Sequence, residues 1–309
     1  MTSIVSVYRR WPTRADCIRH LEEVRWGEKP ICPYCGAERV SRNRDDSREA
    51  TAERWKCQRC IKSFSVTVGT IFHNTHVDLQ RWFLLISLMM SAKKGLSAMQ
   101  AARDLEMRRP TVWSMMHRIR NAMKEDGELL SGLVEMDEAF IGGKPRKGVR
   151  KDMDDDGPRD PGAKSPVVGA IARKGKVKAK VMKRSELNAN VFRALVHDWM
   201  KLRETVLTTD ELSSYRNLGD IIPHRMINHS SGFYSKRDET FDLGFGKTHT
   251  NTIEAFWSIV RRAIIGQFHH VSQKYLPLYM REICYRYNDR VDQCGLDGVL
   301  NLACNGRHG

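Results

Sequence analysis

The stretch HTNTIEAFWSIVRR, residues 249–262, predicts a helix and carries two charged residues that suggest a function. Apolar residues recur in and just after it with helical spacing, at Ile253, Phe256, Trp257, Val260 and Ile264. We therefore expect an amphipathic helix that packs its apolar face on a neighbouring element. Glu254 and Arg261 lie two turns apart on an adjacent stripe. An acid near the start and a base near the end suit the helix dipole, but Glu254 could also be one member of a carboxylate set that binds metal.

Composition narrows the kind of partner. The 309 residues are enough for two or three domains. They include 52 Lys and Arg against 37 Asp and Glu, for a net charge of +15, which favours a polyanionic partner, with nucleic acid ahead of an anionic membrane. The most apolar run, residues 82–92, is too short to span a bilayer. With no signal-peptide pattern at the N-terminus, we expect a cytoplasmic protein that does not enter a membrane.

Two C-x2-C pairs, Cys32 with Cys35 and Cys57 with Cys60, lie in a segment that otherwise reads as short β-strands. In a reducing compartment such pairs indicate metal binding before disulfides. Four thiolates presented by two tight turns match the tetrahedral coordination of Zn²⁺. The sequence predicts a zinc ribbon with one structural Zn²⁺, and the alternative is four buried cysteines without a ligand.

Residues 95–123 read as a helix, a short turn and a second helix that has Pro110 in its first turn. A recognition helix needs a basic outer face to contact phosphates and base edges. The residues that we expect on this face and in contact with DNA are Arg108, Arg109, Arg118 and Arg120. An ordinary helical hairpin would give the same apolar pattern, but the basic face beside a zinc ribbon favours a DNA-binding helix-turn-helix.

From about residue 130 the pattern is that of an α/β domain. A short strand precedes a hairpin, an amphipathic helix, a buried strand and the helix that carries Glu254. Asp137 ends the first strand and Asp210 ends the later one. Carboxylates from adjacent strand ends and a nearby helix can converge on two Mg²⁺ ions, which serve phosphodiester cleavage and transfer. Three further acids lie close to these two aspartates in the sequence: Glu135, Glu138 and Glu211. We rank them behind Asp137 and Asp210 as metal ligands because only those two are expected at strand ends.

Several motifs together resemble one protein family. They are CPYCG and KCQRC, then TVWSMMHRIR, VEMDEAFIGGK, TDELSSY and HTNTIEAFWSIVRRAIIGQFHHVS. The chain resembles bacterial insertion-sequence transposases of the DDE type with an N-terminal zinc ribbon. The resemblance implies a multidomain α/β protein with a zinc ribbon, a helical segment containing the helix-turn-helix, and an RNase H-like catalytic domain with a mixed five-stranded sheet. In that domain the first acid lies on the first strand, the second follows the fourth strand, and the third lies on a late helix.

The resemblance also assigns roles to individual positions. Asp137, Asp210 and Glu254 become the catalytic metal ligands, for two Mg²⁺ or Mn²⁺ ions. Arg261 stands seven residues after the last acid, where the family usually has Lys, and with Arg262 it is expected to contact a DNA phosphate. His249 and Asn251 precede Glu254 in the chain and are expected to line the site. Asn251 also suits the role of a helix cap.

The predicted organisation has four parts. They are residues 1–73 with the zinc ribbon at 28–73, residues 74–127 with the helix-turn-helix, the catalytic domain at 128–290, and a tail at 291–309. The predicted function is an enzyme, a DNA transposase that binds the inverted repeats at element ends, cuts and joins them to target DNA, and works as a homodimer or larger assembly on DNA at the nucleoid. The alternatives are a non-catalytic zinc-ribbon DNA-binding regulator derived from a transposase, and an RNase H-like nuclease such as a junction resolvase.

Overall fold

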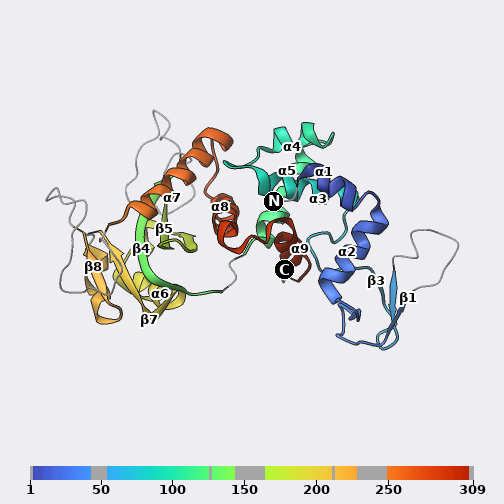
Figure 1. The fold of residues 1–309 in the computed structure, drawn as a ribbon, viewed down its shortest axis with the longest axis horizontal. Helices are drawn as coiled ribbons and strands as arrows, with labels where there is room; N and C mark the ends of the chain where they lie inside the picture. Colours follow the sequence, from blue (N-terminus) through green and yellow to red (C-terminus); the bar gives the residue numbers. More distant parts are fainter. Residues whose placement is uncertain are drawn as a thin grey trace. The chain divides into compact units, whose positions relative to one another are not determined.

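The computed structural model describes residues 3–42, 54–124, 127–142, 164–210, 213–227 and 249–305. The chain divides into two compact units, residues 1–124 together with 293–309, and residues 125–292 (Figure 1). Glu211, one of the three further acids named above, lies outside the described residues, as do residues 143–163. Within the described part, no helix is long and apolar enough to cross a membrane.

The first unit is built mainly from helices. They are α1 (Ile4–Arg10), α2 (Arg14–Trp26), α3 (Leu79–Ser91), α4 (Ala98–Asp104), α5 (Arg109–Ala122) and α9 (Gly295–Asn305). Helix α3 is the apolar run noted in the sequence, and it buries Leu79, Phe83 and Ile86 in the core of this unit. The last helix, α9, packs against α2, α3 and α5. The segment expected to be a tail therefore forms part of the core of the first unit.

A three-stranded antiparallel sheet forms the zinc ribbon, in the order β1 (Val40–Arg42), β2 (Trp55–Cys57) and β3 (Ser63–Phe64). Strand β3 ends at Phe64, and the chain continues in turns. Side-chain bonds divert the chain into turns here, since the hydroxyls of Ser65 and Thr67 lie 2.8 Å apart and Thr70 Oγ1 donates to Thr67 O at 2.7 Å.

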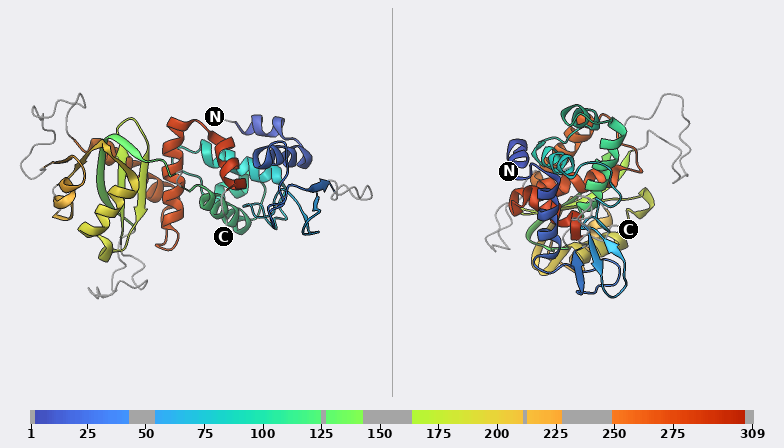
Figure 2. Two further views of the ribbon diagram at one scale, coloured as in Figure 1. Left: turned by 90° about the horizontal axis from the view of Figure 1, so that it is seen from below. Right: turned by 90° about the vertical axis from the view of Figure 1, so that its right-hand side faces the viewer.

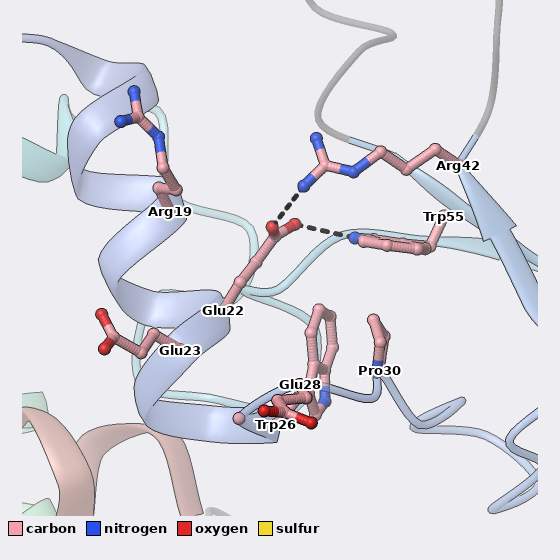
Figure 3. A pocket seen from close by; sticks show the side chains of 9 residues that line it. Arg19, Glu22, Glu23, Trp26, Glu28, Pro30, Arg42 and Trp55 are labelled. Carbon is pink, nitrogen blue, oxygen red and sulfur yellow. Dashed lines mark hydrogen bonds and ion pairs between the residues drawn. The ribbon is translucent and has the colours of Figure 1, made fainter.

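Glu22 attaches the ribbon to α2 (Figure 3). One of its carboxylate oxygens accepts from Arg42 Nη2 and the other from Trp55 Nε1, both at 2.7 Å. Trp26, at the end of α2, meets Trp55 edge to face with ring centroids 6.2 Å apart. These side chains line an open pocket of about 350 Å³. The Glu22 carboxylate is the polar link between helix and sheet.

The second unit contains a five-stranded sheet among the described residues. Its strands are β4 (Leu130–Ile141), β5 (Ser165–Ala172), β6 (Val177–Val181), β7 (Met200–Thr209) and β8 (His224–Met226). The order is β6-β5-β4-β7-β8, with β5 antiparallel to β4 and β6, and with β4, β7 and β8 mutually parallel. This confirms the predicted mixed five-stranded sheet. Strand β4 has 12 residues and is longer than the short strand expected.

Helices cover both faces of this sheet (Figures 1 and 2). The 3₁₀ turn η1 (Arg184–Glu186) precedes α6 (Ala189–Trp199), which packs with η2 (Ser213–Asp220) on one face. The other face carries α7 (Asn251–Arg261), its π-helical continuation η3 (Arg262–Phe268) and α8 (Leu276–Asp292). Strand side chains alternate between faces. Along β4, Val134 and Met136 pack towards α6, whereas Ala139 and Ile141 pack towards α7.

Candidate active site

The parallel pairing of β4 with β7 brings two predicted acids together. Glu135 pairs with Thr208 in this register. Continued by two residues, the register places Asp210, which follows β7 directly, level with Asp137 on β4. Parallel strands lie about 4.8 Å apart and paired residues share a face. Continued in this way, the pairing would bring the two aspartates side by side just beyond the end of β7, and the Asp210 carboxylate raises the pKa of both Asp137 and Glu138.

Trp257 on α7 reaches Asp137 directly. Its indole Nε1 donates to Asp137 Oδ2 at 3.0 Å, and the ring is 1% exposed. Asp137 is paired across the sheet with Gly169 on β5, and a Cβ atom at Gly169 would lie only 2.7 Å from Trp257 Cη2. The missing side chain at Gly169 therefore makes room for the indole that holds the Asp137 carboxylate. Sequence reasoning placed Trp257 on the apolar face and missed its hydrogen bond.

Glu254 lies in the first turn of α7 and is exposed. Thr250 Oγ1 donates to Glu254 Oε1 at 3.1 Å, which orients the carboxylate. The helix begins at Asn251, with Thr250 as the N-cap residue and without a side-chain cap bond. The prediction that Asn251 caps this helix is therefore wrong, because Asn251 is already its first residue. Asn251 is exposed, and His249 is partly buried just before the helix.

The electrostatics of Asp137 reflect its neighbours. The pKa of Asp137 is raised to about 6, chiefly by burial and also by the Asp210 and Glu254 carboxylates, while hydrogen bonds from the Glu138 backbone and Trp257 oppose the rise. The negative charges of Asp210 and Glu254 thus act on Asp137 from two other elements of the unit. Among the described residues, however, no set of three or more acidic side chains has ligand atoms that all lie within 4.8 Å of one another.

Glu138 points to the opposite face of β4. It accepts a hydrogen bond of 2.5 Å from the Oη of Tyr215, which lies in η2 and is fully buried. The pKa of Glu138 is raised to about 7, chiefly by burial and also by the Asp210 and Asp137 carboxylates, while the hydrogen bond from Tyr215 opposes the rise. Burial also raises the pKa of Tyr215 well above its ordinary value, so its hydroxyl remains a donor. This bond ties the segment after Asp210 to the strand that carries Asp137.

Glu135 lies on the α7 face of β4, two residues before Asp137, and is fully buried. It contacts Arg173, which follows β5, and the chain that enters α7. His249 Nδ1 lies 3.3 Å from Glu135 Oε1. His249 thus lies beside Glu135. Sequence reasoning left Glu135 as a neighbouring acid, although its i, i+2 spacing from Asp137 already put both side chains on one face of the strand.

The basic residues fall into two groups. Arg108, Arg109, Arg261 and Arg262 are exposed. Arg120, in contrast, is 1% exposed, so the prediction that it lies on the outer face of α5 is wrong. Arg118 is half-buried and donates from Nη2 to His73 O at 2.7 Å. Helical spacing alone did not separate these two arginines from the exposed ones, because their long side chains reach from the edge of a helix into the core.

The four predicted zinc ligands form one cluster. Their Sγ atoms all lie within 4.8 Å of one another, with Cys32 and Cys60 at 3.7 Å and Cys35 and Cys57 at 3.6 Å. A Zn²⁺ ion bound by four thiolates at about 2.3 Å separates its ligands by about 3.8 Å. The N–H groups of Cys60 and Arg59 donate to Cys57 Sγ and lower the pKa of Cys57 to about 6, which favours the thiolate. The cluster therefore fits one structural Zn²⁺.

Comparisons with known proteins match both units. Residues 129–288, more than half of the chain, match the ISXO2-like transposase domain, and residues 12–63 match the transposase zinc-ribbon domain. An uncharacterized protein in the transposable element ISH50 of Halobacterium salinarum is 26% identical over 274 residues, which are 84% of this chain and 86% of that protein.

Two solved structures of the Mos1 system also match at low similarity. The Mos1 strand transfer complex is 12% identical over 74% of this chain and 78% of that chain, with a TM-score of 0.29. The Mos1 paired-end complex with the left transposon end is 13% identical over 73% and 80%, with a TM-score of 0.27. TM-scores this low support no inference about fold, DNA or assembly. The two domain matches decide the family: the chain belongs to the ISXO2-like transposases and is a DNA transposase with a zinc ribbon ahead of its catalytic domain.

Proposed function

We propose that this transposase binds the ends of an insertion sequence and catalyses metal-dependent strand cleavage and strand transfer with Asp137, Asp210 and Glu254 as its metal ligands. The observation that supports the proposal is the parallel pairing of Glu135 on β4 with Thr208 on β7, which, continued by two residues, would bring Asp137 level with Asp210. Trp257, on the helix that bears Glu254, donates to Asp137. Three carboxylates from three elements form an all-oxygen donor set of the kind that Mg²⁺ or Mn²⁺ requires.

The donor set fits a divalent cation for an electrostatic reason. Asp210 and Glu254 both raise the pKa of Asp137, so the ionised acids repel one another in the folded protein. Bound cations would relieve that repulsion and draw the carboxylates together. When bound, two Mg²⁺ ions would activate the attacking hydroxyl and stabilise the leaving oxygen of the phosphodiester.

The other residues of the site would orient the reacting groups. Trp257 holds one oxygen of the Asp137 carboxylate, and Thr250 orients Glu254. Arg261 lies two turns beyond Glu254 at the exposed end of α7, and Arg262 follows it. Two guanidinium groups in this place would bind the DNA backbone beside the acids.

End recognition is assigned to the first unit. We propose that α4 and α5 act as the helix-turn-helix, with Arg108 and Arg109 at the exposed start of α5 in contact with DNA. Pairing of two element ends requires a dimer or larger assembly on DNA. The enzyme would act at the nucleoid. The buried Arg120 is not part of this interface.

A strand-transfer assay tests the proposal. Full-length protein, Mg²⁺ and a donor DNA with the inverted repeats that flank the gene are mixed with a plasmid target. The matched variant is Asp137→Asn, which keeps the size of the side chain and its acceptor for Trp257. Joined product from the wild type alone supports the proposal. Binding without cleavage by the wild type would favour a DNA-binding regulator, cleavage without joining would favour a resolvase-like nuclease, and full activity of Asp137→Asn would exclude the assigned ligand.

A further inference from the structure

Glu135 is a fully buried carboxylate on the same strand and the same face as Asp137. An ionised carboxylate is costly to bury unless charged or hydrogen-bonding groups surround it. Its surroundings therefore show what it does in the fold, and they differ from those of Asp137.

The first group of partners comes from the start of α7. Glu135 Oε2 accepts from the backbone N–H of Thr252 at 2.8 Å and of Ile253 at 3.0 Å, and Oε1 accepts from Thr252 Oγ1 at 2.9 Å. The first N–H groups of a helix have no carbonyl partner within it, and they attract negative charge. The N-cap residue Thr250 makes no side-chain cap bond. Glu135 caps α7 from the neighbouring strand.

Arg173 supplies the balancing charge. Its Nε donates to Glu135 Oε1 at 2.7 Å, and its Nη2 donates to the carbonyl of His249 at 2.9 Å. Its backbone N–H donates to Leu133 O on β4 at 2.9 Å. Arg173 therefore joins the end of β5, the strand β4 and the chain just before α7, and all three meet at Glu135.

The same contacts exclude Glu135 as a metal ligand. Its two oxygens accept four hydrogen bonds, from Arg173, from Ile253 and from two groups of Thr252, and a carboxylate offers about four lone-pair positions. It has no exposed surface.

Glu135 and Asp137 together fix the register of α7 along β4. Two strand residues span about 6.6 Å, and four helical residues span about 6 Å. Glu135 binds the helix at Ile253, and Asp137 binds it four residues later at Trp257. The two attachments match in spacing, so the helix cannot slide along the strand without breaking both. Glu254 follows Ile253 directly, and its place relative to Asp137 is set by this pair.

We propose that Glu135, with Arg173, is a positioning residue that holds α7 so that Glu254 can bind the same metal as Asp137. This inference rests on the proposed function, in which Asp137 and Glu254 are metal ligands. It assigns to Glu135 no contact with substrate or metal.

The test uses full-length protein and Mn²⁺ as the probe, with free Mn²⁺ measured by electron paramagnetic resonance. Glu135→Gln keeps the size of the side chain and loses its charge. The matched control is Glu282→Gln, which alters another fully buried acid of the same unit, on α8 next to Arg286. Asp137→Asn is the reference for loss of a ligand. Three further measurements are made on the same proteins. They are cleavage of end DNA as a function of Mn²⁺ concentration, binding of end DNA by gel shift, and amide hydrogen exchange of residues 250–257.

For Glu135→Gln we expect the Kd for Mn²⁺ and the Mn²⁺ needed for half-maximal cleavage to rise by about tenfold or more, as for loss of a residue that orients a ligand. Hydrogen exchange at the start of α7 should become faster, and DNA affinity should not change. Glu282→Gln should leave Mn²⁺ binding and exchange in residues 250–257 as in the wild type, even if it lowers the unfolding temperature.

Wild-type Mn²⁺ binding by folded Glu135→Gln would overturn the positioning role. If that variant does not fold, Thr252→Val is used in its place, because it removes a single hydroxyl donor to Glu135. We expect its Kd for Mn²⁺ to rise by about fivefold, which corresponds to the free energy of one hydrogen bond. An unchanged Kd there would also overturn the role. Equal Mn²⁺ binding by wild type and Asp137→Asn would instead refute the proposed metal site itself. This result distinguishes failure of the proposed function from failure of the positioning role of Glu135.

Discussion

Substitution of Gly169 by alanine tests how the Asp137 carboxylate is held. The new Cβ would lie 2.7 Å from Trp257 Cη2 and 2.8 Å from Cζ2, closer than non-bonded carbons approach. The indole is 1% exposed and packs among the apolar side chains of β5, α7 and α8, so it has little space to retreat. Gly169→Ala should therefore displace the ring and break its bond to Asp137.

Two costs add up in this variant. Overpacking of a filled core costs about 1–3 kcal/mol. Loss of a hydrogen bond to a charged group costs about 1.5–3 kcal/mol. Alanine at an unstrained strand position otherwise stabilises by about 0.5–1 kcal/mol, because it restricts the unfolded chain. We expect the free energy of unfolding of Gly169→Ala to fall by about 2–5 kcal/mol, with a loss of end cleavage.

A double-mutant cycle with Trp257→Phe isolates the contact. Phenylalanine lacks both indole carbons that approach Gly169, as well as the N–H donor. Gly169→Ala should therefore cost less than about 1 kcal/mol in the Trp257→Phe background, which gives a coupling energy of about 1–5 kcal/mol. The measurement is urea unfolding of the four full-length proteins, followed by far-ultraviolet circular dichroism so that the change of tryptophan content does not alter the signal.

Two results would refute this reasoning. One is additivity of the two substitutions within about 0.5 kcal/mol, since independent sites behave in that way. The other is stabilisation by Gly169→Ala in the wild-type background, which would mean that the indole accommodates the methyl group.

Three further predictions concern charge and metal. Asp137→Asn in metal-free protein should raise the free energy of unfolding above pH 7 by up to about 3 kcal/mol. The pKa of Asp137 is raised from 3.8 to about 6 by folding. Its favourable contribution to stability is therefore fully present below pH 3.8 and is lost as the pH rises through 6. Unfolding midpoints from pH 4 to 8 measure it. Cys57→Ser should lower bound zinc, measured by elemental analysis, below one ion per chain, because one of four thiolates is lost. Arg109→Ala should weaken end binding and lower the salt slope by about 1, whereas the buried Arg120→Ala should lower only the unfolding temperature.

Each of these predictions has a contrary outcome. A constant stability difference between wild type and Asp137→Asn across pH 4–8 would mean that ionisation of Asp137 does not oppose folding. Full zinc content in Cys57→Ser would place the ion elsewhere. An unchanged salt slope for Arg109→Ala, or a lowered one for a fully folded Arg120→Ala, would contradict the assignment of the exposed start of α5 to DNA.

Much of this protein was predictable from local pattern. The two C-x2-C pairs specified the zinc ribbon, because each pair is a tight turn that presents two thiolates whatever surrounds it. Helical and strand periodicity predicted α5, α7 and the strands around Asp137 and Asp210. The family resemblance followed from these motifs, and the domain matches confirmed it.

Other assignments needed contacts between distant parts of the chain. Arg108 directly precedes α5 and Arg120 lies within it. Arg108 is exposed, whereas Arg120 is only 1% exposed. Periodicity gives the angle of a side chain around a helix, but burial depends on which elements pack against that helix. The zinc ribbon and helical segment also share a unit with α9 near the end of the chain, a link that no local pattern carries.

The sequence by itself determined that β4 carries three acids, and the tertiary structure alone decided what distinguishes them. Glu135 and Asp137 have the same charge, strand and face, and Glu138 differs from them in face only. Glu135 meets the N–H groups of α7, which lies 117 residues along the chain, and Glu138 meets Tyr215. The physical reason is that backbone periodicity is set by neighbours in the chain, whereas the free energy of a buried charge is set by the donors and charges that folding brings around it.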